Sequence, residues 1–319
     1  MNRHDNKKMN QILLNKTTTT SIKGIAILLV IIAHVGHVGF GIRLLVPLGC
    51  FGVSVFLILS GYGLMESYSR NGLKDFWRKR VLRVLLPYLI WICFYSIYLL
   101  ISHKPITSHD IRYWFVEYII IWYVAFYYIM KFCPYYKWSL FLVIAILILL
   151  IKPCLQAQQS LSFLIGMLLS YYKNRIIGIK APTLLLIGCL FLFIGLAAFG
   201  VRQWIVISDN GIIITGMSDF LITKNIDDGD YATKIIQIVT KLPISLFIII
   251  LLNFIHIEKN RLSYIIGLAS YELYLVHMSF YQYISNSVLN LLLFTIKTIV
   301  LSYLLYRCDK NLSRYVCNS

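Results

Sequence analysis

Long apolar runs separated by short polar breaks fill this chain, and they restrict its fold more than any other feature. About 20 apolar residues in an α-helix cross the hydrocarbon core of a bilayer. Hydrophobic residues make up 59% of the chain and charged residues 13%, about half of the share (roughly 25%) that is usual in soluble domains. We therefore expect an all-α, polytopic transmembrane bundle of about ten helices, over residues 23–42, 45–66, 84–102, 113–132, 138–152, 159–172, 182–200, 235–257, 263–284 and 287–306.

Two neighbouring segments, 138–152 and 159–172, are shorter than a usual span. Three arrangements suit such lengths: tilted helices, a helix broken at Pro153, or a partly re-entrant pair. All three stay open at this point.

The distribution of basic residues predicts the orientation of the bundle. The chain carries 30 Lys and Arg against 13 Asp and Glu, a net charge of +17. Most of these cations lie in the gaps on one side of the segments, as in the cytoplasmic loops of polytopic proteins. No basic domain stands outside the apolar segments, so we expect no nucleic-acid partner. We predict a cytoplasmic N-terminal segment at 1–20, a transmembrane domain at 21–307 and a cytoplasmic tail at 308–319, with membrane lipid around the bundle.

Neither the cysteines nor the carboxylates form a pattern that is typical of a metal site. The seven cysteines are scattered, most of them in or beside apolar runs, and no two form a Cys-x-x-Cys pair. The acidic run at 227–230 matches no defined calcium loop, which favours a solvated turn. We therefore predict that the protein uses no metal.

The first apolar segment carries a cation and an imidazole at a helical spacing. Lys23 and His34 are eleven positions apart, and successive helical residues rotate by about 100°, so the two side chains lie within about 20° of each other. The same steps rise about 16 Å, roughly half of the hydrocarbon core. An ionisable group at this depth is costly and indicates a functional site. The imidazole of His34 suits general-base chemistry, whereas the alternative is a structural hydrogen bond between helices. His37, one turn further, can equally face water.

A basic segment leads into the third apolar run. Arg80 and Arg83 are three residues apart and lie on one face of a helix. Two guanidinium groups on one face form a site for phosphate groups at the cytoplasmic surface. The alternative is that they anchor the helix to anionic lipid.

The ninth segment contains an acid and an imidazole in one apolar run. Tyr274 and His277 are one turn apart and share a face, whereas Glu272 lies on a different side of the helix. A packed polar cluster between helices is the structural alternative to a catalytic His277. In the fourth segment, Glu117 either pairs with a buried cation or lies at the outer interface near Arg112. The roles of Glu117 and Glu272 stay open.

Together, these motifs resemble the acyltransferase-3 family of integral membrane acyltransferases. The shared marks, in chain order, are Lys23-x10-His34, the run Phe51–Tyr62, the Arg80-x-x-Arg83 pair before Leu86-Pro87-Tyr88, and Ser270-Tyr271-x-x-Tyr274-Leu275-x-His277. The first cation of the family is usually Arg, and Lys23 keeps the charge without the two-pronged geometry of a guanidinium.

The resemblance implies a membrane O-acyltransferase that moves an acyl group, typically acetyl, from cytoplasmic acyl-CoA to a hydroxyl of a cell-envelope polysaccharide or lipid-linked glycan. It implies acetyl-CoA as the co-substrate, held by Lys23, Arg80 and Arg83, and a place in the cell (inner) membrane. His34 and His277 are then the expected catalytic residues, with His34 either a base or a covalent acyl carrier.

Two other functions remain as alternatives. Some proteins of this shape have been assigned to polysaccharide export or translocation. A transporter that relays protons through intramembrane histidines would be expected to carry inverted repeats, and none is visible in the sequence. The Arg80 and Arg83 pair together with His34 favours the enzyme, since an exporter needs no site for the phosphates of CoA. The oligomeric state is left open.

Overall fold

The computed structural model describes residues 14–107, 113–210, 231–285 and 287–318, and in those residues it contains helices and no strands. Eight helices in this part of the chain are long and apolar enough to cross a membrane. The predicted all-α transmembrane fold is therefore confirmed. The α-helices are α2 (Lys16–His34), α3 (Val46–Asn71), α4 (Phe76–Arg80), α5 (Leu86–Ile101), α7 (Trp114–Phe132), α8 (Lys137–Ile151), α9 (Cys154–Ala157), α10 (Ser162–Tyr171), α11 (Lys173–Ile177), α12 (Ala181–Asn210), α14 (Tyr231–Phe254), α15 (Arg261–Leu268), α16 (Ser270–Phe280) and α17 (Val288–Asn318).

Each of the ten predicted segments corresponds to helical structure, but two of them differ from a simple span. The predicted segment 159–172 forms the ten-residue helix α10, and the predicted segment 263–284 is divided at Ala269 into α15 and α16. α8 ends at Ile151, and Pro153 is the N-cap of the short helix α9, which begins at Cys154. A break at Pro153 was one of the expected arrangements, and it follows from the ring that fixes the proline backbone.

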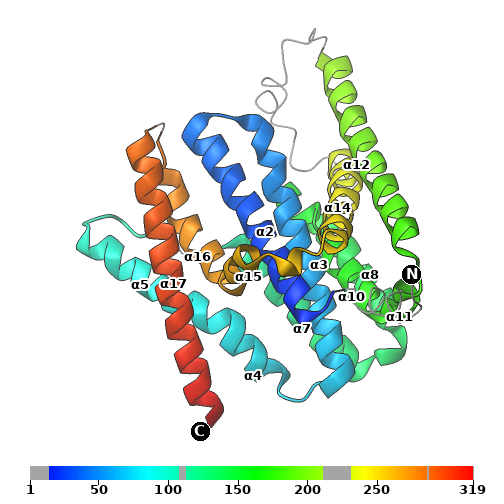
Figure 1. Cartoon of the computed structure of the whole chain (residues 1–319), viewed down its shortest axis with the longest axis horizontal. Coiled ribbons are helices and arrows are strands. Elements are labelled where there is room, and N and C mark those ends of the chain that lie inside the picture. The colour runs from blue at the N-terminus through cyan, green and yellow to red at the C-terminus, as the bar shows by residue number, and fades with distance from the viewer. Residues whose placement is uncertain (1–13, 108–112, 211–230, 286, 319) are drawn as a thin grey trace.

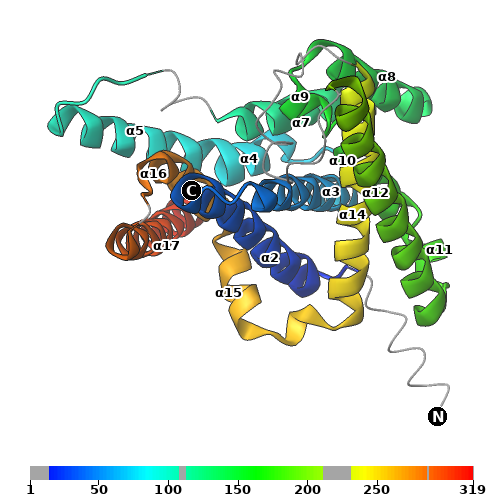
Figure 2. The same ribbon diagram turned by 90° about the horizontal axis from the view of Figure 1, so that it is seen from above.

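The helices α2 and α3 lie at the centre of the molecule in both views (Figures 1 and 2). α2 packs against α3, α15 and α16, and α3 also packs against α10 and α14. At the edge of the molecule α12 lies beside α14, while α5 and α17 lie on the other side of α2 (Figure 1). Polar side chains on the inner faces of α2 and α3 are therefore enclosed by protein.

The first helix begins seven residues earlier than predicted, at Lys16 rather than Lys23. The side chain of Asn15 caps this end and accepts a hydrogen bond of 2.8 Å from the backbone N–H of Thr18. Residues 17–20, which belong to the predicted N-terminal segment 1–20, are part of the helix, and Thr18 is fully buried. Lys23 therefore lies almost two turns inside α2, not at its end.

α3 and α10 pack at very short range because each helix has a glycine at the contact. A Cβ added to Gly61 of α3 would collide with the backbone carbonyl oxygen of Phe163, and one added to Gly166 of α10 would collide with that of Ile58. Small residues permit such close approach between helices in a membrane. Gly61 and Gly166 therefore allow α3 and α10 to pack closely.

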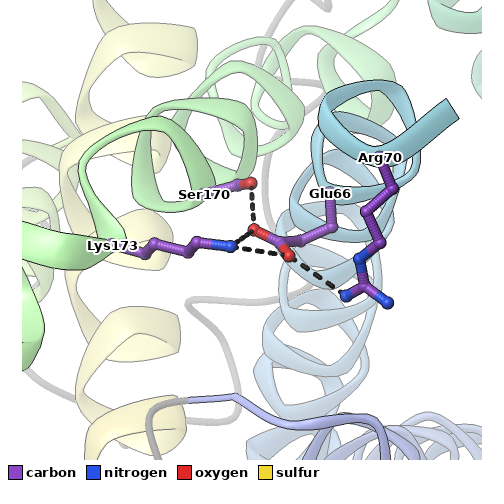
Figure 3. A network of polar contacts seen from close by, with 4 residues as sticks. All are labelled: Glu66, Arg70, Ser170 and Lys173. Atoms are coloured by element: carbon purple, nitrogen blue, oxygen red, sulfur yellow. Dashed lines mark hydrogen bonds and ion pairs between the residues drawn. The ribbon is translucent and has the colours of Figure 1, made fainter. Parts of the chain in front are cut away.

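A polar cluster around one carboxylate, that of Glu66, lies near the C-terminal ends of α3 and α10 (Figure 3). Glu66 of α3 accepts hydrogen bonds from Lys173 (2.7 and 2.9 Å), from the Ser170 hydroxyl (2.9 Å) and from Arg70 (3.2 Å). The sequence prediction ended the second helix at residue 66, but α3 continues to Asn71. The helix can continue through a buried acid because neighbouring cations neutralise it.

Candidate active site

A cavity of about 230 Å³ lies between α2, α3, α4, α7 and α16, and it brings the three predicted cations together. Lys23, Arg80 and Arg83 all line it, although Lys23 comes from α2 and the two arginines from a later segment of the chain. We call it the cation cavity. Its other walls are mainly apolar and aromatic, including Phe56, Phe115 and Tyr123. The predicted convergence of Arg80 and Arg83 on one surface is thus observed, and Lys23 joins them.

Local structure sets the position of each cation. Arg80 is the last residue of α4, and its guanidinium carbon lies 5.4 Å from the centre of the Phe76 ring and 5.2 Å from that of Tyr123. These distances are within the range of cation–π contacts, which fix a guanidinium without neutralising it. Arg83 follows in the π-helical turn Val81–Leu85 and is exposed.

No carboxylate in the described part of the chain lies within ion-pair distance of Lys23, Arg80 or Arg83. The Arg80 Nε atom is also buried without a hydrogen-bond partner. Three cations that share one cavity repel one another, and a bound anion relieves that repulsion. The cluster therefore fits a phosphate-bearing ligand.

A second cavity, of about 300 Å³, lies further along α2 and contains the predicted imidazole. His34 and His37 both line it, and we call it the histidine cavity. His37 is exposed in the π-helical turn Val35–Gly39 that follows α2. Gln159 and Cys50 form part of the opposite wall, where the amide of Gln159 donates to the Cys50 carbonyl oxygen at 3.1 Å.

His34 and His277 are in direct contact, with 3.2 Å between His34 Nδ1 and His277 Nε2. The Nδ1 atom of His277 lies 2.9 Å from the backbone carbonyl oxygen of Leu273. A carbonyl oxygen only accepts, so His277 Nδ1 carries a proton, and the Nε2 atom of the neutral ring is an acceptor. His34 Nδ1 then donates to His277, and His34 Nε2 keeps a free lone pair. His277 therefore orients the ring of His34.

The two cavities meet at a shared wall. Val30, Val53 and Tyr274 line both of them. Along α2, Lys23 and His34 are about 16 Å apart by helical rise, one on each side of this wall. The cations and the histidines thus belong to one continuous region on the same face of α2.

The break between α15 and α16 at Ala269 positions the last motif of the chain, which runs from Ser270 to His277. α15 packs across the first turns of α2, where a Cβ on Gly267 would collide with the Thr20 carbonyl oxygen. α16 then runs beside α2, with Ser270 and Tyr271 at the cation cavity and His277 at His34. A continuous helix through 263–284, as predicted, would not follow both courses.

The remaining candidates are placed as follows. Glu272 is buried on α16 and lines neither cavity, and Glu117 lies half-buried in the first turn of α7. Arg112, the predicted neighbour of Glu117, is outside the described residues. No group of three or more His, Cys, Asp or Glu side chains in the described part of the chain is arranged to hold a metal ion.

Three residues of the site were not assigned a role from the sequence. The Tyr281 ring stacks on His34 with 4.7 Å between ring centres, Gln159 forms part of the histidine cavity, and Tyr123 packs on Arg80. Only Tyr123 had a sequence signal, because it is one of several aromatic residues around Glu117.

A comparison with protein families shows which family the chain belongs to. The model of the acyltransferase-3 family, described as an acyltransferase domain, matches residues 20–307. The chain belongs to the acyltransferase-3 family. It is therefore a multi-pass membrane acyltransferase, as its apolar helices also indicate. No curated protein and no solved structure matches this acyltransferase closely enough for comparison.

Proposed function

We propose that this acyltransferase moves an acetyl group from cytoplasmic acetyl-CoA to a hydroxyl of a cell-envelope glycan, either a polysaccharide or a lipid-linked precursor. The observation that supports this best is that the cation cavity and the histidine cavity share the wall formed by Val30, Val53 and Tyr274. A donor with a phosphate-bearing end and a distant thioester suits such a pair of cavities. The proposal includes a cell (inner) membrane location, cytoplasmic termini, and the segments 1–20, 21–307 and 308–319.

In this proposal the cation cavity holds the phosphate groups of acetyl-CoA. Arg80 and Arg83 supply guanidinium groups, which bind phosphates with two parallel hydrogen bonds, and Lys23 adds a point charge deeper in the protein. The arm of the donor then extends along α2 toward His34. The apolar wall residues of both cavities suit a thin, weakly polar chain.

His34 acts as the general base. Its Nε2 lone pair takes the proton of the acceptor hydroxyl while the hydroxyl oxygen bonds to the thioester carbonyl carbon. The carbon–sulfur bond then breaks, and the sulfur leaves as the thiolate of CoA, which takes up the proton. The contact of 3.2 Å with His277 lets the two rings share the positive charge while His34 is protonated.

A covalent route is the alternative role of His34. In it, His34 Nε2 attacks the thioester itself and carries the acetyl group before the acceptor arrives. The two routes differ in one measurable species, because only the second forms an acetylated protein when acetyl-CoA is added without acceptor. We expect rapid-quench mass spectrometry to find no acetylated His34.

The function is tested by the acyl content of the surface glycan. Cells that carry the wild-type protein, His34→Ala or Arg80→Ala are compared by NMR of the extracted glycan. We expect both variants to lose the acyl groups at normal polymer levels. If acyl content is unchanged in every strain while polymer export falls, the protein is an exporter and the proposed function is wrong.

Donor binding is tested with the purified protein. We expect acetyl-CoA to bind and the Arg80→Ala/Arg83→Ala variant to bind it at least about tenfold more weakly, which corresponds to about 1.4 kcal/mol. The matched control is Arg78→Ala/Lys79→Ala, which removes two cations from the same segment but none from the cavity lining. Equal affinities in both double variants would assign Arg80 and Arg83 to lipid anchoring.

A further inference from the structure

Among the residues that the structure describes, the wall between the two cavities contains one polar side chain, Tyr274. The other two residues that line both cavities, Val30 and Val53, are aliphatic and form no side-chain hydrogen bonds. Tyr274 lies on α16, one turn before His277, and its ring centre is 5.6 Å from that of His277. The tyrosine therefore lies between the proposed base and the cations.

The hydroxyl of Tyr274 is buried, its oxygen faces the backbone N–H of Phe115, and its O–H has no acceptor. The side chain is 5% exposed, and its ring packs on Phe115 with 5.1 Å between ring centres. Buried hydroxyl groups usually have a partner in folded proteins, and each exception needs an explanation. Tyr271, one turn earlier on α16, has such a partner, because it donates to the Val84 carbonyl oxygen at 2.9 Å. A ligand that reaches the wall would supply the acceptor that the Tyr274 O–H lacks.

We propose that Tyr274 is a catalytic residue whose hydroxyl donates a hydrogen bond to the carbonyl oxygen of the donor thioester. The inference rests on the proposed function, since it requires a thioester at the wall between the cavities. When the acceptor oxygen bonds to the carbonyl carbon, the π electrons of the C=O bond move onto the carbonyl oxygen. The Tyr274 O–H holds this oxyanion until the pair returns, the carbon–sulfur bond breaks and the thiolate leaves.

The position of the wall explains why this group is needed there. An oxyanion that forms in an apolar, water-poor region is stabilised only by donors already in place. The neighbouring valines offer none, and His34 is occupied with the proton of the acceptor. Tyr274 thus supplies the stabilisation from the donor side while His34 acts from the acceptor side.

The kinetic test compares Tyr274→Phe with Tyr118→Phe. Tyr118 of α7 is also buried, with a hydroxyl that has no acceptor, but it lines neither cavity, so it is a matched control. We expect Tyr274→Phe to lower kcat on the order of 100-fold, as for other oxyanion donors, with the Kd of acetyl-CoA within about twofold of wild type. Tyr118→Phe is expected to turn over like wild type. Equal kcat values for wild type and Tyr274→Phe would overturn the inference.

A spectroscopic test separates a hydrogen bond from a merely structural role. Acetyl-CoA labelled with ¹³C at the carbonyl is bound to the His34→Ala protein, which does not turn it over, and its carbonyl stretch is measured by infrared difference spectroscopy. We expect the bound frequency to lie below the value without a hydrogen bond, and to shift upward when Tyr274→Phe is added. An unchanged frequency contradicts the inference alone. If wild-type protein binds no acetyl-CoA, the proposed function fails and the inference fails with it.

Discussion

The two faces of α3 show how one helix can serve packing on one side and a cavity on the other. Gly61 faces α10, where a Cβ would collide with the Phe163 carbonyl oxygen. Gly63, two residues later, lines the cation cavity, and a Cβ there would meet no atom within 4 Å. The same residue type thus permits close packing on one face and open space on the other.

The two faces of α3 also differ in how their charges are paired. We call the face toward α10, with Gly61 and Glu66, the packed face, and the face toward the cation cavity, with Gly63, the hollow face. On the packed face, Lys173 and Arg70 surround the carboxylate of Glu66. On the hollow face, Lys23, Arg80 and Arg83 share a cavity with no carboxylate at ion-pair distance in the described residues. A cation whose counter-charge is part of the protein stabilises the fold, whereas cations without one are available to a ligand.

The largest expected effect comes from adding a methyl group at Gly61 of α3, and Gly63 of the same helix is the matched control. Gly61→Ala forces α3 and α10 apart, and we expect it to lower the free energy of unfolding by about 3 kcal/mol, the upper end for an overpacked contact. Gly63→Ala has room for its methyl group and gains helix propensity, so its stability should stay within about 1 kcal/mol of wild type. Thermal unfolding of the purified proteins in one detergent measures both.

These two variants also separate stability from binding. Gly63→Ala narrows the cation cavity and should weaken acetyl-CoA binding while the protein stays folded. If Gly61→Ala and Gly63→Ala melt at the same temperature, the two faces of α3 do not differ as described.

Removing the carboxylate from the packed face is the next largest change. Glu66→Ala leaves Lys173 without its partner, and we expect a loss of about 2 kcal/mol. This is below the range for fully buried pairs because the Lys173 side chain is 35% exposed. The affinity for acetyl-CoA should not change, as measured by calorimetric titration at a temperature where the variant is folded. A tenfold fall in affinity would mean that the two faces are coupled.

On the hollow face, we expect the loss of Lys23 to weaken acetyl-CoA binding less than the loss of both Arg80 and Arg83. Lys23→Met removes one of three cations, and we expect acetyl-CoA to bind about fivefold more weakly, which is about 1 kcal/mol. Lys23→Arg keeps the charge and should bind within about twofold of wild type. The melting temperature of Lys23→Met should not fall, since the substitution relieves repulsion from Arg80 and Arg83. A lower melting temperature would assign Lys23 a structural role.

Most of the residues that line the two cavities were predictable, because their spacing in a helix determines which side chains share a face. Lys23 and His34 share a face of α2, and Arg80 and Arg83 meet at one cavity, as their spacings predict. The contact between His34 and His277 was not predictable, because it depends on how α16 packs against α2. Spacing within one helix is set by local geometry, but contacts between helices depend on tertiary packing.

The other features that the sequence did not predict also depend on contacts or local structure that the hydrophobic pattern does not reveal. Glu66 was not recognised as a site because its partner Lys173 is more than a hundred residues away. The early start of α2 depends on the Asn15 cap, and a run of threonines has no strong helical preference to indicate it. The division at Ala269 leaves the hydrophobic pattern uninterrupted, since both α15 and α16 are apolar.

The smallest expected effect is at the outer edge of the packed face, where Arg70 pairs with Glu66. The Arg70 side chain is 73% exposed, and the pair is spaced four residues apart on α3. Exposed helical pairs of this kind contribute only about 0.3–0.5 kcal/mol and are screened by salt. We expect Arg70→Ala to lower stability by about that amount at low ionic strength and by nothing measurable in molar salt. A loss as large as that of Glu66→Ala would mean that Arg70, and not the more buried Lys173, is the main partner of the carboxylate.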